Sequence, residues 1–150
     1  MAGMKLTAQT GDVALGVATK KTVVMIIMPT NQRGKLIGWG VSFDGVTAAA
    51  EPVTCELFRP TSAGTGTSLT PAKFDDDQAE AIQSTAKHTC TVEPTYGDII
   101  ESKLVHPQGG RYDRYFPEDI RPHMKGASRM GIACTAPAAV NVCAYLIYEE

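Results

Sequence analysis

The sequence predicts an all-β protein: a jelly-roll-like antiparallel β-sandwich over residues 13–150, with one short helix and an extended N-terminal arm over residues 1–12. Short apolar runs cut by Gly, Pro, Asn and Asp recur along the chain, as in strands joined by turns. Residues 133–150 hold two β-branched and aromatic runs around a Pro-Ala-Ala turn, which predicts a closing hairpin. Uneven connections favour a jelly roll over an up-and-down barrel.

The first half of the chain contains two well-marked strands. Residues 13–19 form a weak predicted strand. Residues 22–28, TVVMIIM, are apolar on both faces, as in a strand that is covered on both sides. In residues 36–43, LIGWGVSF, large side chains alternate with two glycines and a serine. The glycines predict that another group packs closely against their face.

The remaining elements follow the same rules. Residues 60–73 and 106–129 are rich in Gly and Pro and predict long loops. Residues 75–82, DDDQAEAI, are the only helical candidate, since their aspartates suit a helix N-terminus. Further strands are predicted at 53–59, 87–92, 99–105, 112–116, 130–136 and 140–148. The predicted core contains Val24, Ile26, Trp39, Val41, Phe43, Leu57, Ile132, Val142 and Leu146.

Composition limits the classes of function. The 150 residues suit one domain, and 43 % hydrophobic with 20 % charged residues is ordinary for a globular protein. The formal net charge of -2 argues against a general nucleic-acid binder. The first residues lack the apolar centre of a secretion signal, and the run 23–28 is too short to span a bilayer. We therefore expect cytoplasmic synthesis, no membrane partner and no nucleic-acid partner.

The four cysteines, Cys55, Cys90, Cys134 and Cys143, each lie in an apolar run and form no CxxC pair. We expect small buried side chains with free thiols. A Cys134–Cys143 disulfide across the closing hairpin is the alternative, and cytoplasmic synthesis argues against it.

No segment carries a specific catalytic motif. His88 and Cys90 share a strand face and are possible zinc ligands, but no second pair stands at ligand spacing. His106 and His123 fall in predicted loops. The sequence also lacks GxSxG, the cupin HxH pattern and EF-hand spacing at residues 75–77. We expect no cofactor, no metal and no enzymatic activity.

Residues 111–129 predict a protein interface, because Arg and Tyr are enriched where proteins meet. Binding of single-stranded nucleic acid is a weaker alternative, since interleaved acidic residues dilute the positive charge. A surface loop held by its own salt bridges is a further alternative. The candidate interface residues, including three from the arm, are Met4, Lys5, Leu6, Arg111, Tyr112, Arg114, Tyr115, Phe116 and Arg121.

Three stretches resemble head decoration (cement) proteins of tailed bacteriophages: WGVSFDG at 39–45, RYDRYFPEDIRP at 111–122 and TAPAAVNVCAYLIYEE at 135–150. The similarity is strongest over residues 20–60 and 100–150. Membership of that family would imply a β-rich domain on the outside of an icosahedral shell, commonly as a homotrimer at local threefold positions. It would also imply no enzymatic activity.

The leading functional expectation is a virion structural protein that decorates and stabilises the capsid exterior, with the major capsid protein and copies of itself as partners. A phage tail component or a host- or carbohydrate-binding β-sandwich is the alternative. A small cupin-like metalloenzyme that uses His88, His106 or His123 is a third reading. A carbohydrate-binding role predicts an exposed aromatic platform, whereas the only tryptophan, Trp39, lies in a strand predicted to be buried.

Overall fold

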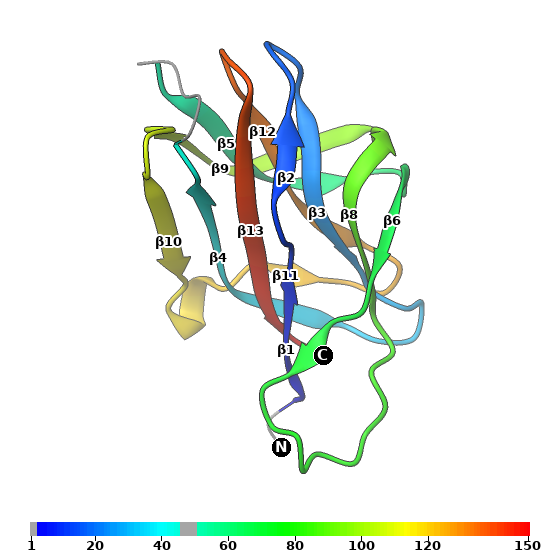
Figure 1. Ribbon diagram of the computed structural model, residues 1–150. Helices are drawn as coiled ribbons and strands as arrows, with labels where there is room; N and C mark the ends of the chain where they lie inside the picture. The colour runs from blue at the N-terminus through cyan, green and yellow to red at the C-terminus, as the bar shows by residue number, and fades with distance from the viewer. Residues whose placement is uncertain (1–2, 46–50) are drawn as a thin grey trace.

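The computed structural model describes residues 3–45 and 51–150, in which two antiparallel sheets pack face to face as a sandwich (Figure 1). The seven-stranded sheet has the order β10-β4-β13-β1-β7, with β11 beside β4 and β2 beside β13. The six-stranded sheet has the order β6-β8-β3-β12-β5-β9. The elements are β1 (Lys5–Gln9), β2 (Val13–Leu15), β3 (Lys21–Ile27), β4 (Gly34–Phe43), β5 (Val53–Pro60), β6 (Thr65–Leu69), β7 (Ala72–Lys73), β8 (Thr85–Val92), β9 (Tyr96–Val105), β10 (Arg111–Tyr115), the 3-10 turn η1 (Glu118–Ile120), β11 (His123–Met124), β12 (Arg129–Thr135) and β13 (Val140–Glu149).

The path of the chain between the sheets is that of a jelly roll. Strands β1, β4, β10 and β13 lie in the seven-stranded sheet, and β3, β5, β9 and β12 lie in the six-stranded sheet. The chain therefore crosses between the sheets at each step from β1 through β3 and β4 to β5, and again at each step from β9 through β10 and β12 to β13. The passage from β5 to β9 ends in the sheet where it began. Neighbours such as β13 and β1 therefore come from opposite ends of the chain, and the predicted jelly-roll-like sandwich is confirmed.

The core lies between the two sheets. Along β13, buried and half-buried positions alternate over the whole strand, as in a strand with one face on the core. Every residue predicted for the core is buried. In β4 a register shift opposite Ile147 and Tyr148 places Leu36, rather than Ile37, in the core beside Trp39.

The outer face of the six-stranded sheet is covered as well. Met25, Phe58 and Ala133 are buried but lie outside the main core cluster. The Tyr96 ring packs on Phe58 with 4.9 Å between ring centroids. Strand β3 is buried at its five central positions, so the predicted coverage of residues 22–28 on both faces is confirmed.

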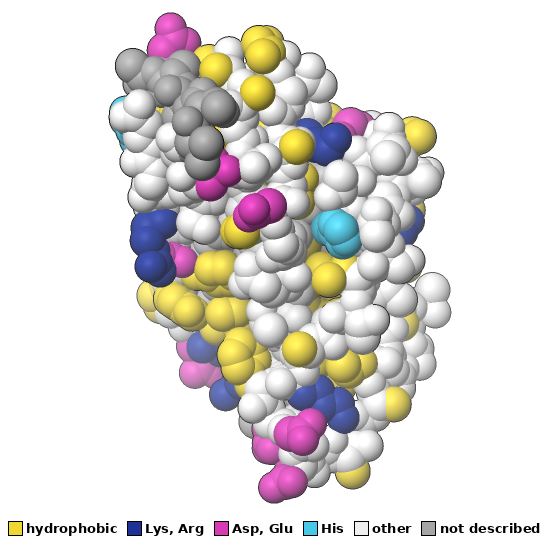
Figure 2. Space-filling model, in the orientation of Figure 1, with side chains coloured by type: hydrophobic (Ala, Val, Ile, Leu, Met, Phe, Trp, Pro, Cys, Tyr) yellow, Lys and Arg dark blue, Asp and Glu magenta, His cyan; other side chains and the backbone are white. Residues whose placement is uncertain are grey.

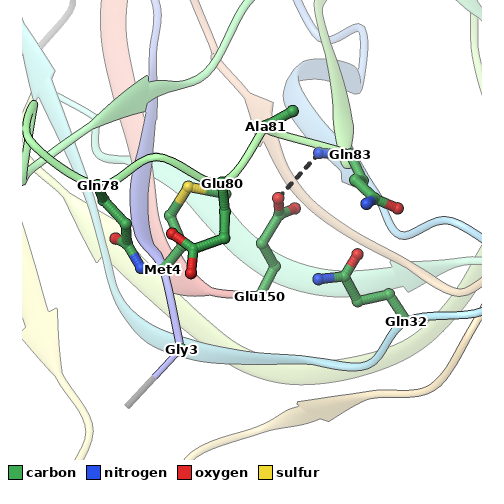
Figure 3. A pocket seen from close by; sticks show the side chains of 8 residues that line it. All are labelled: Gly3, Met4, Gln32, Gln78, Glu80, Ala81, Gln83 and Glu150. Carbon is green, nitrogen blue, oxygen red and sulfur yellow. Dashed lines mark hydrogen bonds between the residues drawn. The ribbon is translucent and has the colours of Figure 1, made fainter. Parts of the chain in front are cut away.

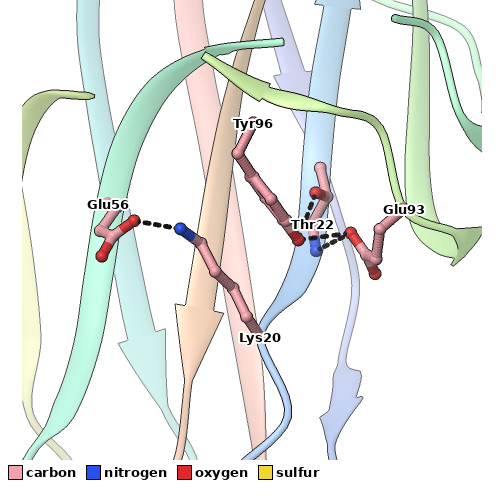
Figure 4. Close-up of polar contacts among 5 residues, drawn as sticks. All are labelled: Lys20, Thr22, Glu56, Glu93 and Tyr96. Atoms are coloured by element: carbon pink, nitrogen blue, oxygen red, sulfur yellow. Dashed lines mark hydrogen bonds and ion pairs between the residues drawn. The ribbon is translucent and has the colours of Figure 1, made fainter. Parts of the chain in front are cut away.

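Polar contacts hold this outer cover in place (Figure 4). The Oε2 atom of Glu93 accepts hydrogen bonds from the Thr22 backbone N–H and the Tyr96 hydroxyl, each at 2.8 Å. Lys20 Nζ lies 4.2 Å from the centre of the Tyr96 ring and 2.6 Å from Glu56 Oε2. This network has a structural role, because its charged groups have partners within it.

The prediction of an extended arm over residues 1–12 is wrong for residues 4–10, and residues 1–2 lie outside the described part. Residues 5–9 form β1, which pairs with β13 on one side and β7 on the other. Met4 and Glu150 exchange backbone hydrogen bonds of 2.9 and 3.0 Å. Leu6 and Ala8 are fully buried. The alternation of Leu6, Ala8 and Thr10 is short, and its meaning depends on a distant partner strand.

The helix predicted at residues 75–82 is also wrong. These residues form turns, in which the backbone N–H groups of Asp77 and Gln78 bond to Asp75 at 3.1 and 3.3 Å. The side chains offer no continuous apolar face to bury, so a short helix gains no tertiary stabilisation there. The short 3-10 turn lies at Glu118–Ile120 instead. The predicted loop 60–73 contains the short strands β6 and β7.

The predicted closing hairpin over residues 133–150 is wrong: β12 pairs with β3 and β5, and β13 pairs with β1, β2 and β4, so the two strands are joined in sequence but belong to different sheets. The alternative Cys134–Cys143 disulfide is absent as well. Cys134 lies in β12 of the six-stranded sheet and Cys143 in β13 of the seven-stranded sheet, so the two thiols face different surroundings. Cys134 lies opposite Cys55, with 3.6 Å between their sulfur atoms, and Cys143 contacts Asp12. The four cysteines carry free thiols, and three of them are buried.

The role of β1 gives a direct test. Leu6→Ala is expected to lower the free energy of unfolding by about 2–5 kcal/mol, because it removes a fully buried side chain. Lys5→Ala is the matched control in the same strand, where the side chain is exposed, and its effect should stay within about 0.5 kcal/mol. Chemical denaturation of both variants measures the difference. Equal stabilities would mean that residues 4–10 are a free arm.

Candidate binding face

Strand β10 carries most of the sequence-predicted interface residues and sorts them onto two faces. It pairs with β4, and exposed and half-buried positions alternate along it. Tyr112 and Arg114 turn toward the interior of the sandwich. Arg111, Asp113 and Tyr115 stand on the outer face.

The inward-facing set of β10 belongs to the scaffold. The Tyr112 ring lies 5.3 Å from the Trp39 ring between centroids, and its hydroxyl donates to Glu101 of β9. Arg114 lies 4.0 Å from Glu101, which is an ion-pair distance, and 5.2 Å from the Phe116 ring. Phe116 is itself buried. These contacts join the edge strands of the two sheets.

On the outer face, two tyrosine rings occupy the space that the glycines of β4 leave open. A Cβ atom at Gly38 would stand 2.9 Å from Cδ1 of Tyr115, and one at Gly40 would stand 2.5 Å from Cε1 of Tyr145. In the register, Gly40 lies between Asp113 of β10 and Tyr145 of β13. The side chain of Tyr145 therefore crosses β4 along the sheet, and the predicted close packing against the glycines is found.

The hydroxyl of Tyr145 ends on Asp113, which is also paired with Arg111. Tyr145 donates to Oδ1 of Asp113, while Arg111 contacts Oδ2 through Nε at 2.8 Å and Nη2 at 2.6 Å. The hydrogen bond from Tyr145 and the adjacent guanidinium lower the pKa of Asp113. Burial and the bond to Asp113 raise the pKa of Tyr145. At neutral pH the carboxylate is charged and the phenol is protonated.

These residues line a shallow depression of about 470 Å³. We call it the tyrosine face. Figure 2 shows a band of apolar side chains across this part of the seven-stranded sheet. Tyr115 is 61 % exposed and Phe74 is 59 % exposed. The tyrosine face consists of Thr7, Gln9, Phe74, Arg111, Asp113, Tyr115, Tyr145 and Ile147.

A second hollow, of about 420 Å³, lies beside Met4 and Glu150 (Figure 3). The Glu150 carboxylate accepts the backbone N–H groups of Gln83 and Ser84, each at 2.9 Å. Its side chain is thus used to tie the segment after β7 to the end of β13. Among the described residues that line this hollow there is no aromatic side chain.

Two edge strands meet on one side of the sandwich and form a second candidate surface. Within the described residues, β9 pairs only with β5 and β10 only with β4, and the contacts to Glu101 bring the two strands together. Leu104 of β9 is 70 % exposed and Ile99 is 53 % exposed. We call β9, with these two side chains, the open edge. A long edge strand with exposed apolar groups is a template for pairing with another chain.

The histidines predicted as possible ligands lie in separate places. His88 is in β8, with Nδ1 2.9 Å from the hydroxyl of Thr89. Nδ1 of His106 accepts the Gln108 backbone N–H at 3.1 Å, and His123 is in β11. In the described part of the chain, no three His, Cys, Asp or Glu side chains gather as a metal site would require. Nor do residues 3–45 and 51–150 contain a helix that could cross a membrane.

The predicted interface is therefore only partly a surface. Of the arm residues, Met4 and Leu6 are buried and Lys5 is exposed. Arg121 is half-buried and donates to the Phe116 carbonyl at 3.4 Å. Arg111 and Tyr115 remain on the outer surface, whereas Tyr112, Arg114 and Phe116 point inward.

Sequence reasoning missed Tyr145, Asp113 and Phe74 as members of one surface. The sequence did contain a signal for Tyr145. Along β13 this residue alternates with the apolar side chains of the core, which places it on the opposite face of the strand. Together with Gly40 on the neighbouring strand, this alternation predicts an outward-facing aromatic residue beside a backbone that no side chain covers. What places Asp113 within reach is the pairing of β10 with β4.

Neither a protein-family model nor a curated protein sequence matches this chain. The jelly-roll fold is established by the strand order alone.

The contact between Asp113 and Tyr145 can be tested by titration. Asp113→Asn should lower the pKa of Tyr145, because the phenolate would no longer face a carboxylate, while burial keeps that pKa above the ordinary value. Because the folded-state pKa of Asp113 is itself lowered, its ion pair is intact at neutral pH and is lost as the pH falls through that lowered value. NMR titration of the tyrosine rings measures both effects.

The matched control is Asp119→Asn in η1. It should leave the titration of Tyr145 unchanged. If the Tyr145 pKa is the same in Asp113→Asn as in the unaltered protein, then the hydrogen bond across β4 does not form in solution.

Proposed function

We propose that this protein is a virion structural protein that decorates the outer surface of a bacteriophage head and performs no reaction. Its partners would be the major capsid protein and two further copies of itself. The observation that carries this proposal is the open edge, where a ten-residue strand with exposed Leu104 and Ile99 has one side without a partner in the described residues.

The open edge suits assembly by strand addition. Unpaired backbone N–H and C=O groups on β9 can bond to an extended segment of a neighbouring subunit, and the apolar side chains can pack beside it. The contacts of Glu101 with Tyr112 and Arg114 stiffen this side of the sandwich, so docking would require little ordering of the protein.

Stabilisation of a shell would come from many modest contacts. One edge contact is weak alone, but subunits that touch each other and the shell bind through several contacts at once. Dissociation at one contact is then opposed by the others. The jelly-roll sandwich supplies the rigidity that such a brace needs.

A tail location would use the same surface, so the position in the particle decides between the two readings. The resemblance of residues 39–45, 111–122 and 135–150 to head decoration proteins favours the head. Electron microscopy of intact particles, with the protein tagged, would place it on the shell or on the tail.

The assembly role of the open edge can be tested on particles. Leu104→Glu is expected to reduce the occupancy of the protein on heads by about tenfold or more, because a charge would be buried at the contact. Val17→Glu is the matched control, since Val17 is 62 % exposed and lies after β2, in an isolated bridge to Ala136 away from the open edge. Quantitative gels of purified particles measure occupancy.

The fold of both variants is checked by thermal unfolding, which should be unchanged because both side chains are exposed. Equal occupancy of Leu104→Glu and the unaltered protein would exclude the open edge as the docking surface. Sedimentation of the free protein measures the fraction that forms trimers. Leu104→Glu should lower this fraction if the copies also contact each other through β9.

A further inference from the structure

The tyrosine face has a chemistry that the proposed docking does not use. Its two rings are held on the outer surface of the seven-stranded sheet, whereas the open edge presents the side of the sandwich. We infer that the tyrosine face binds a neutral glycan, with sugar rings stacked on Tyr115 and Tyr145. This inference goes beyond the proposed function and does not depend on it.

The first argument is the shape of the aromatic surface. The glycines at 38 and 40 let the rings of Tyr115 and Tyr145 lie against the backbone of β4. A ring seated along a sheet presents a flat apolar face to solvent. The carbon–hydrogen faces of pyranose rings are flat and apolar as well, so they can pack on such rings as other apolar groups do.

The second argument is the rigidity of the platform. Tyr145 is fixed at its far end by the hydrogen bond to Asp113, and Asp113 is fixed in turn by Arg111. The rings therefore need little ordering when a ligand arrives. A pre-organised site loses less conformational entropy on binding, which matters most for weak ligands such as sugars.

The third argument is charge. Arg111 and Asp113 form an ion pair, so the charged side chains that line the depression sum to zero. A strongly charged partner would find no uncompensated group there. A neutral ligand rich in hydroxyl groups would find both kinds of partner: guanidinium N–H donors that Asp113 does not use, and the one carboxylate lone pair, on Oδ1, that Tyr145 and Arg111 leave.

Gln9 adds a further acceptor at the side of the depression. Its amide nitrogen donates to the carbonyls of Thr10 at 3.0 Å and Ala144 at 3.4 Å, which fixes the side chain and leaves Oε1 for a ligand hydroxyl. Polar groups that are held in place around an apolar floor are the usual composition of a small-ligand site.

The fourth argument is size. The depression of about 470 Å³ lies within the range of small-ligand sites, roughly 300–1,000 Å³. It is shallow and extends from Arg111 on β10 to Phe74 beyond β7, so a short chain of sugars can lie across the strands. Phe74 is exposed and offers a third ring at that end.

The test uses the full chain in solution with four neutral trisaccharides as probes: maltotriose, cellotriose, mannotriose and N,N′,N″-triacetylchitotriose. At least one is expected to bind in the millimolar range or tighter, measured by NMR shifts of the tyrosine rings. Tyr115→Ala should weaken that binding by about tenfold or more, because it removes an exposed stacking surface. Tyr115→Phe keeps the ring and should bind within about threefold of the unaltered protein.

Ile120→Ala is the matched control, since Ile120 is exposed but lies in η1, outside the tyrosine face. It should bind as the unaltered protein does. The inference is overturned if none of the four probes binds, or if Tyr115→Ala binds them unchanged. It is also overturned if Tyr115→Ala only reduces occupancy on particles, because the face would then dock a protein. The Leu104→Glu result is independent of these outcomes.

Discussion

The fold and the binding face both depend on the register of β13 between β4 and β1. Val142, Ala144, Leu146 and Tyr148 point into the core, and the residues that alternate with them face outward. Because side chains alternate with a period of two, a slip of one residue would expose this core set and bury Tyr145 and Ile147. The free energy of core burial therefore also decides which side chains meet solvent on the seven-stranded sheet.

The parts of the fold that could be predicted are those with a strong local signal. Residues 22–28 and 140–148 are long, apolar and β-branched, so they read as strands without knowledge of their partners. The short strand at residues 5–9 could not be assigned this way, because its stability comes from the edge of β13 that it covers. The aspartates at residues 75–77 suited a helix start, but a helix also needs an apolar face to bury, and residues 75–82 have none.

The candidate site was less predictable, because it is assembled across strands. Tyr145, Gly40 and Asp113 come from β13, β4 and β10, and only the order of those strands makes them neighbours. The segment rich in Arg and Tyr, predicted as an interface, does contribute Arg111 and Tyr115 to the outer surface. Its alternation divides it between scaffold and surface: Tyr112 helps to join the sheets, while Tyr115 faces solvent. Composition alone cannot make that division, since both residues are tyrosines within one strand.

The tyrosine face depends on the absence of side chains at two glycines of β4, on which its rings lie. At Gly40 a single methyl group would collide with the side chains of Tyr145 and Asp113, and at Gly38 it would collide with the Tyr115 ring and also with the backbone carbonyl of Arg114 in β10. In evolution, one substitution at Gly40 could therefore displace the rings of the tyrosine face without changing a side chain of the core. Lineages of this chain that keep both glycines would therefore be those in which selection still acts on the face, and drift to alanine would mark its abandonment.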